Sequence, residues 1–98
     1  MVIWSLPAKQ DLRHIYDYIS TDSKYFARKA VNTFIEKTEQ LNDYPRMGRI
    51  VPEIGSEDVR ELIIYSYRLI YQVSEGGIKV LKIIHGKQSF PYNKFADK

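Results

Sequence analysis

The stretch from Val59 to His85 constrains the fold most strongly, because nearly all of it has the pattern of β-strands. Three segments, VRELII, YRLIYQV and IKVLKIIH, are rich in the β-branched and aromatic residues that strands favour. Glu75-Gly76-Gly77 is a hairpin-turn sequence, and Tyr65-Ser66 marks a weaker turn before it. Turns this short join antiparallel neighbours, so the sequence predicts a three-stranded antiparallel meander.

The first half of the chain predicts one strand and two helices. Val2 to Ser5 is a short apolar run typical of a strand. Ser5 is a candidate cap for a first helix, and Pro7 follows where the first turn of a helix tolerates proline. Ser20 to Ser23 supplies caps for a second helix, from about Lys24 to Asn42. The short link predicts an antiparallel helical hairpin. Apolar residues with helical spacing mark the first helix at Leu12, Ile15, Tyr16 and Ile19.

The order of predicted elements is β-α-α-loop-β-β-β within 98 residues, enough for one domain but not for two. We therefore expect a single domain over residues 1–98 with an α+β fold. An N-terminal strand and an antiparallel helical hairpin would pack on an antiparallel sheet of about four strands. The Pro45 to Asp58 segment is expected to be a surface loop, where function often resides. The tail, 86–98, either docks across the sheet or frays.

Composition excludes several classes of site. The chain has no cysteine, which rules out disulfides, thiolate zinc sites and cysteine nucleophiles. The two histidines, His14 and His85, lack metal-site spacing, and no glycine-rich phosphate loop is present, so we expect no metal and no cofactor. No apolar run reaches about 18 residues, and the start does not resemble a signal peptide. We expect a cytoplasmic protein that does not span a membrane.

The net charge is +3, from 15 Lys and Arg against 12 Asp and Glu. A basic chain of this kind favours an anionic partner, either a nucleic acid or an acidic protein, although many such domains bind neither. Basic residues in the loop and near the meander form either a rim for a phosphate backbone or ordinary solvated charges. These residues are Arg46, Arg49, Arg60 and Lys87.

Alternation of side chains along a strand assigns each residue of the meander to one face. With a two-residue loop at 75–76 or 76–77, Arg68 shares a face with His85, either diagonally or directly across. Both faces are largely apolar, so the pattern does not say which one the helices cover. The Arg68 face also holds Glu61, Ile63, Ile70, Gln72, Lys79, Leu81 and Ile83, and the other holds Arg60, Leu62, Tyr67, Leu69, Tyr71, Val80, Lys82 and Ile84.

Arg68 and His85 are the most specific candidates for chemistry. A guanidinium can hold a phosphate with two hydrogen bonds, and a nearby histidine can transfer a proton near neutral pH. Together with a carboxylate base, these two groups would suffice to cleave RNA through its 2′-hydroxyl. Separately, Glu53 in the proline-flanked loop is a candidate general base. The commoner role of such residues is structural: an arginine and a histidine that cap a sheet, and a solvated loop acid.

Several motifs, taken in order, resemble those of RelE/ParE superfamily toxins from bacterial type II toxin–antitoxin systems. They cover residues 2 to 87. The resemblance implies a small growth-inhibiting toxin that a cognate antitoxin neutralises in a hetero-oligomer, with DNA gyrase or ribosome and mRNA as its target. The segments are IWS, A-x-x-DL-x-x-IYDYI, L-x-x-YPRMGR-x-VPE, RELI, YRLIYQV and I-x-V-L-x-IIHG.

A RelE-like toxin would be a ribosome-dependent, metal-independent mRNA endonuclease. The resemblance then places Arg68 where the scissile phosphate is held. It places Glu53 at the position of the glutamate that serves as the general base in the YoeB-like branch. His85 falls one residue before that branch's catalytic histidine. Arg60 matches a basic position, and Lys87 stands where the nuclease has a tyrosine.

A ParE-like toxin would inhibit DNA gyrase by binding, without established catalytic residues. The DL-x-x-IYDYI and PRMGR-x-VPE motifs look more like the ParE branch, although the usual HG-x-R ending reads HGKQ here. We therefore favour gyrase inhibition, with Arg49, Arg60 and Lys87 as target-binding candidates. The mRNA endonuclease is the alternative, and a member that only binds its partner is the third reading.

Overall fold

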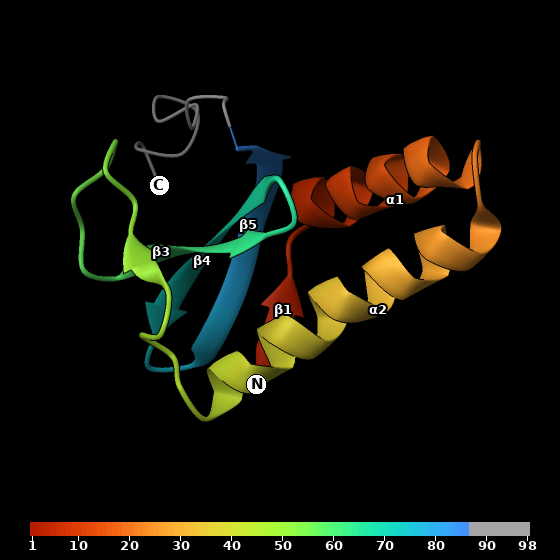
Figure 1. Ribbon diagram of the computed structural model, residues 1–98. Coiled ribbons are helices and arrows are strands. Elements are labelled where there is room, and N and C mark those ends of the chain that lie inside the picture. The colour runs from red at the N-terminus through yellow and green to blue at the C-terminus, as the bar shows by residue number, and fades with distance from the viewer. Residues whose placement is uncertain (87–98) are drawn as a thin grey trace.

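The computed structural model describes residues 1–86, which form a five-stranded sheet with a helical hairpin beside it (Figure 1). The predicted tail, 86–98, lies outside the described residues except for Gly86. Among residues 1–86, no helix combines the length and apolar character needed to cross a membrane. The elements are β1 (Val2–Trp4), α1 (Leu6–Ser20), α2 (Lys24–Glu39), the 3-10 turn η1 (Gln40–Asn42), β2 (Arg49–Ile50), β3 (Val59–Ile64), β4 (Tyr67–Ser74) and β5 (Gly77–His85).

The α+β class and the helical hairpin are confirmed, but the sheet has five strands in the order β1-β5-β4-β3-β2 rather than about four. The additional strand, β2, lies within the predicted loop and pairs with β3. Two residues are too few for the alternation that reveals a strand in sequence. The sheet is also mixed, because β1 pairs with β5 in parallel. That direction is set by pairing between opposite ends of the chain, which no local pattern reports.

The predicted caps and turns are confirmed. The Ser5 and Ser23 hydroxyls accept hydrogen bonds from backbone N–H groups in the first turns of α1 and α2. Tyr65 and Ser66 form a two-residue turn, with Tyr65 at a φ of 56°. Ser74 pairs with Gly77, so the last hairpin loop is at 75–76, one of the two predicted positions.

A β-bulge changes the predicted faces of the last strand. Leu81 is an extra residue in β5, so pairing with β4 shifts by one beyond it. The prediction that Arg68 and His85 share a face is therefore wrong. The sequence of β5 does not reveal the bulge, because both faces of this strand are apolar and an extra residue does not interrupt any polar–apolar alternation. The pairs beyond the bulge are Ile70–Lys82, Leu69–Ile83, Arg68–Ile84 and Tyr67–His85.

Two apolar clusters lie on opposite faces of the sheet. The larger one packs the helices against the face that carries Leu69 and Tyr71. The smaller one, on what we call the loop-side face, packs the 51–58 loop against β4 and β5. The larger cluster is built on Ala8, Ile15, Phe34, Leu41, Ile64, Leu69, Tyr71, Ile78, Val80 and Ile83, and the smaller on Val51, Ile70 and Ile84.

Asp11 fixes the helical hairpin to the sheet where β1 ends. Its carboxylate accepts hydrogen bonds from the Ile83 backbone N–H at 2.9 Å and from Lys82 Nζ at 2.8 Å. β1 has already ended at Trp4, so Asp11 supplies the acceptor that a longer edge strand would have given.

Gly48 is needed for the close approach of the loop to the sheet. A Cβ at this position would lie 2.5 Å from the Glu61 carbonyl oxygen and 2.7 Å from Tyr71 Oη. We predict that Gly48→Ala lowers the free energy of unfolding by about 2 kcal/mol, because backbone and a buried ring must move. Gly76→Ala, with no atom within 4 Å of its Cβ, should change it by less than about 0.5 kcal/mol. Urea denaturation measures both, and equal stability of the two variants would contradict the prediction.

Candidate functional site

A chain of ion pairs runs across the loop-side face, and we call its members Arg49, Glu61, Arg68 and Glu53 the ion-pair chain. Arg68 Nη1 and Nη2 donate to the two oxygens of Glu53 at 2.8 and 2.7 Å, a bidentate contact. Arg68 Nε donates to Glu61 Oε1 at 2.7 Å. The other oxygen of Glu61 accepts from Arg49 Nε. Strands β2, β3 and β4 and the loop therefore meet in this chain.

Burial increases toward the middle of the ion-pair chain. The Glu61 side chain is 0% exposed, that of Arg68 8%, that of Glu53 26% and that of Arg49 63%. The hydrogen bond to Glu53, followed by the bond and charge of Glu61, raises the pKa of Arg68 above its ordinary value, although burial opposes this. Two positive and two negative groups balance, as buried charges require.

The structure brings together only part of the predicted catalytic set. Glu53 and Arg68 are in contact, as a base and a phosphate ligand would be. His85 lies on the helix-side face, where its ring packs edge to face on Tyr67 with centroids 5.9 Å apart. Lys87 lies outside the described residues. Within residues 1–86, no group of three or more His, Asp or Glu side chains could hold a metal ion.

The sequence analysis did not identify Glu61 as the ion-pair partner of Arg68 and Arg49. The alternation rule placed it on the face of Arg68, and the register confirms this, since Glu61 lies opposite Ile70 and Arg68 opposite Ile63. A single acid inside the apolar segment VRELII, diagonal to an arginine on the next strand, was a usable signal. A carboxylate at such a position requires a cation beside it.

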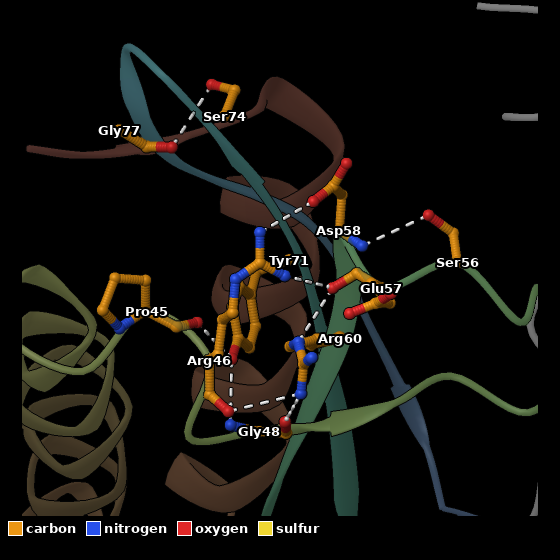
Figure 2. Close-up of polar contacts among 10 residues, drawn as sticks. All are labelled: Pro45, Arg46, Gly48, Ser56, Glu57, Asp58, Arg60, Tyr71, Ser74 and Gly77. Carbon is orange, nitrogen blue, oxygen red and sulfur yellow. Dashed lines mark hydrogen bonds and ion pairs between the residues drawn. The ribbon is translucent and has the colours of Figure 1, made fainter.

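Arg46 and Arg60, two of the predicted phosphate-binding residues, clamp the loop instead (Figure 2). Arg60 Nη1 donates to the carbonyl oxygens of Gly48 and Arg46 at 2.9 and 3.3 Å, and its Nε donates to that of Glu57 at 2.9 Å. Arg46 donates to the Glu57 carbonyl at 2.7 Å and to Asp58 Oδ1 at 2.9 Å. Both guanidinium groups thus bind acceptors within the fold.

The Tyr71 side chain, on β4, binds backbone groups at the start of the same loop. Its hydroxyl donates to the Pro45 carbonyl at 2.8 Å and accepts from the Gly48 N–H at 3.0 Å (Figure 2). Burial raises the pKa of Tyr71 above its ordinary value of 10.0, with the Gly48 hydrogen bond acting in the opposite direction. The loop is therefore anchored at its start by Tyr71 and Arg60 and at Glu53 by Arg68.

Two apolar grooves open on the helical hairpin. The first, of about 390 Å³, carries two cations, Lys9 and Arg13, among apolar walls. The second, of about 460 Å³, is rich in aromatic side chains and reaches the turn between β3 and β4. The first is lined further by Trp4, Leu12, Tyr16, Val31 and Ile35, and the second by Tyr18, Ile19, Phe26, Lys29, Ala30, Tyr65 and Tyr67.

Solved structures with a similar architecture include a chain of a ParDE system, an isolated RelE toxin and a chain of a YoeB-YefM complex. A chain of the chromosomal ParDE system from P. aeruginosa superposes with a TM-score of 0.70 at 26% identity, covering 86% of this chain and 92% of that one. The isolated E. coli RelE toxin gives 0.62 at 17% identity over 99% and 95% of the chains. A chain of the YoeB-YefM complex from Staphylococcus aureus gives 0.55 at 19% identity over 87% and 94%. The last two show the fold alone.

Sequence comparison places the chain among the toxins of type II toxin–antitoxin systems. The model of the family described as "ParE toxin of type II toxin-antitoxin system, parDE" matches residues 2–90, and the chain belongs to that family. A curated relative, Toxin RelE2 of Caulobacter vibrioides, is 29% identical over 85 residues, which is 86% of this chain and 92% of the relative. The resemblance to RelE/ParE superfamily toxins is thus confirmed.

Arg68→Ala is predicted to destabilise the loop-side face, so a loss of activity in this variant would not by itself show that Arg68 is catalytic. The change leaves Glu61 wholly buried with Arg49 as its partner in the ion-pair chain. We expect a loss of about 3 kcal/mol in the free energy of unfolding. Arg13→Ala, which removes an exposed pair with Asp17, should cost less than about 0.5 kcal/mol. Chemical denaturation of both variants measures the difference; similar losses would show that the ion-pair chain adds no stability.

Tyr71→Phe is predicted to lower stability and to change its pH dependence. Below pH 10 the variant should be less stable by about 1–3 kcal/mol, because the Gly48 N–H and the Pro45 carbonyl lose their partner. Since the folded-state pKa of Tyr71 is raised, its contribution is present below the ordinary pKa and is lost as the pH rises through the folded value. The stability difference should therefore narrow above pH 10 in denaturation curves. A difference that stays constant to pH 11 would contradict this.

Proposed function

We propose that this toxin acts by binding and inhibiting DNA gyrase, not by cutting mRNA. The observation that carries the proposal is the placement of Arg68 and His85 on opposite faces of the sheet. A group that holds the phosphate and a group that transfers the proton in one reaction must both lie within hydrogen-bond reach of the reacting atoms. Membership of the ParE family supports the same conclusion.

The state of Arg68 supports the proposal further. Its Nε and both terminal nitrogens donate to carboxylates, so a phosphate at this place would have to displace Glu53. Arg46 and Arg60 are likewise engaged by carbonyl oxygens of the loop. A RelE- or YoeB-like mRNA endonuclease remains the alternative reading, and the contact between Glu53 and Arg68 favours it. Either target would place the action of the toxin in the cytoplasm.

A cognate antitoxin is the partner that we propose for the first groove on the helical hairpin. The P. aeruginosa structure is described as a ParDE toxin–antitoxin system, and the S. aureus one as a YoeB-YefM complex. The groove has apolar walls between α1 and α2, with Lys9 and Arg13 among its lining residues. This arrangement fits an amphipathic helix whose apolar face fills the groove and whose acidic flank faces the two cations.

The proposal predicts the order in which macromolecular synthesis stops after induction of the toxin in a bacterial host. Thymidine incorporation should fall within the first minutes while methionine incorporation continues, because DNA replication depends on gyrase. Filamentation and cleaved DNA–gyrase complexes should follow. Pulse labelling with the two radiolabelled precursors measures the order. Methionine incorporation that collapses first would overturn the proposal in favour of the endonuclease.

The His85→Gln variant distinguishes gyrase inhibition from mRNA cleavage, because it changes a residue outside the ion-pair chain. The side chain is exposed and lies on the opposite face from Arg68. If the toxin binds gyrase, the variant should inhibit growth about as strongly as the wild type. A complete loss of toxicity, with normal expression and an unchanged unfolding midpoint, would support proton transfer by His85 instead.

A further inference from the structure

The described residues end beside the second groove of the helical hairpin. The Gly86 N–H donates to the Ser66 carbonyl oxygen at 2.7 Å, in the turn between β3 and β4. Tyr65 and Tyr67, which precede and follow Ser66, both line the second groove. The 87–98 segment therefore begins at a turn whose side chains form one wall of the groove.

Much of the aromatic surface at the second groove is open to water. Tyr18 is 74% exposed, Phe26 62% and Tyr65 60%. Tyr65 also has a φ of 56°, a conformation that is uncommon for an aromatic residue. Its ring nevertheless packs edge to face on Phe34 at 6.1 Å between centroids, and its hydroxyl donates to Thr33 at 3.1 Å. The turn thus holds an aromatic ring beside the groove, and exposed apolar surface of this kind marks a binding site.

The 87–98 segment has aromatic side chains that the groove can bury. Its sequence, KQSFPYNKFADK, contains one aromatic residue on each side of Pro91, namely Phe90 and Tyr92. Pro91 favours an extended conformation at Phe90, and alternate residues of an extended chain point to the same side. The sequence thus predicts that Phe90 and Tyr92 form a pair of anchors. Phe90 is four residues beyond Gly86, so it lies within about 14 Å of it and can reach the groove.

We propose that the 87–98 segment binds the second groove of its own chain, with Phe90 and Tyr92 buried between the helical hairpin and the turn at Tyr65. The proposal goes beyond gyrase inhibition and does not depend on it. Binding within one chain leaves the first groove open to the antitoxin, because the lining residues of the two grooves differ. The second groove is then closed to other partners unless they displace the segment.

Tethering and geometry favour this occupant over a separate partner or a second copy. A tethered segment acts at an effective concentration of the order of millimolar, which an unattached protein of moderate affinity does not match. The loop-side face is the alternative surface for the segment, but there the 51–58 loop already packs on Ile70 and Ile84. The groove on the helix side is therefore the apolar surface that remains open to the segment.

A spin label on the 87–98 segment tests the proposal in the full chain. The chain contains no cysteine, so Lys94→Cys gives a single attachment site. Nuclear magnetic resonance of the isotope-labelled protein then shows which backbone amide signals the label broadens. We expect strong broadening at Ile19 and Phe26, which line the second groove from the helical hairpin, and much less at Lys9 in the first groove.

The anchors are removed by Phe90→Ser with Tyr92→Ser, and the matched control carries Gln88→Ser with Asn93→Ser. Burying one aromatic side chain changes a binding equilibrium by about tenfold or more. The anchor variant should therefore lose most of the broadening at Ile19, while the control keeps it. Unchanged amide signals of β3 and β4 in both variants report that the sheet is folded.

Two outcomes would overturn the proposal. The first is broadening at Ile19 that is no stronger than at Lys9, or that is equal in the anchor variant and the control, since the segment then does not occupy the groove. The second concerns a mixture of isotope-labelled protein without the spin label and spin-labelled protein without the isotope. Broadening at Ile19 in this mixture would place the segment of a second copy in the groove, and we expect none.

Discussion

The carboxylate of Glu61 is wholly buried between two arginines, and the loop-side face is organised around it. Burial of an ionised group costs several kcal/mol unless partners of opposite charge replace the lost water. Arg68 supplies one partner from β4 and Arg49 another from β2, so one buried charge holds three strands in position. Although Arg49 is 63% exposed, its salt bridge reaches the wholly buried carboxylate of Glu61 and so ties β2, an edge strand of only two residues, to β3.

The 45–58 segment, which contains β2, depends on this charge and on a second anchor whose acceptors and donors are mainly backbone groups. Arg60 and the Tyr71 hydroxyl bind backbone groups at Pro45, Arg46 and Gly48, where the absence of a side chain at Gly48 lets the segment approach the sheet. A buried carbonyl or N–H without a partner costs as much as a lost hydrogen bond, so these contacts fix the path of the main chain. The loop is therefore held by specific polar contacts at both ends of the 45–53 stretch.

The sequence patterns correctly predicted the features that depend on residues close together in the chain. The caps at Ser5 and Ser23, the turn at Tyr65 and the assignment of Glu61 to the Arg68 face all depend on residues close in sequence or on a single pairing. The two-residue strand β2, the parallel pairing of β1 and the bulge at Leu81 do not, because each is decided by packing between distant segments.

The bulge had the largest consequence for the candidate site. Parity along β5 was counted correctly from the turn at 75–76, but one extra residue reverses every assignment beyond it. His85 was thereby placed beside Arg68 when it lies beside Tyr67. The link between Arg68 and Glu53 came only from the family resemblance, since nothing in the spacing of a loop acid and a strand arginine predicts their contact.

The distribution of charge changes the meaning of the basic composition. Arg46, Arg49, Arg60 and Arg68 are engaged by carboxylates or carbonyl oxygens of the fold, so this part of the excess positive charge serves the structure. The exposed cations of the helical hairpin are Lys9, Arg13, Lys24, Arg28, Lys29 and Lys37. Two of them lie in the lining of the first apolar groove. Apolar walls with cations among them complement an acidic amphipathic partner better than a nucleic-acid backbone, which would need a row of uncommitted arginines and lysines. The surface most open to a macromolecule is thus on the helices, while Arg68, the arginine that most suggested phosphate chemistry, lies on the opposite face of the sheet within the contacts that hold the loop.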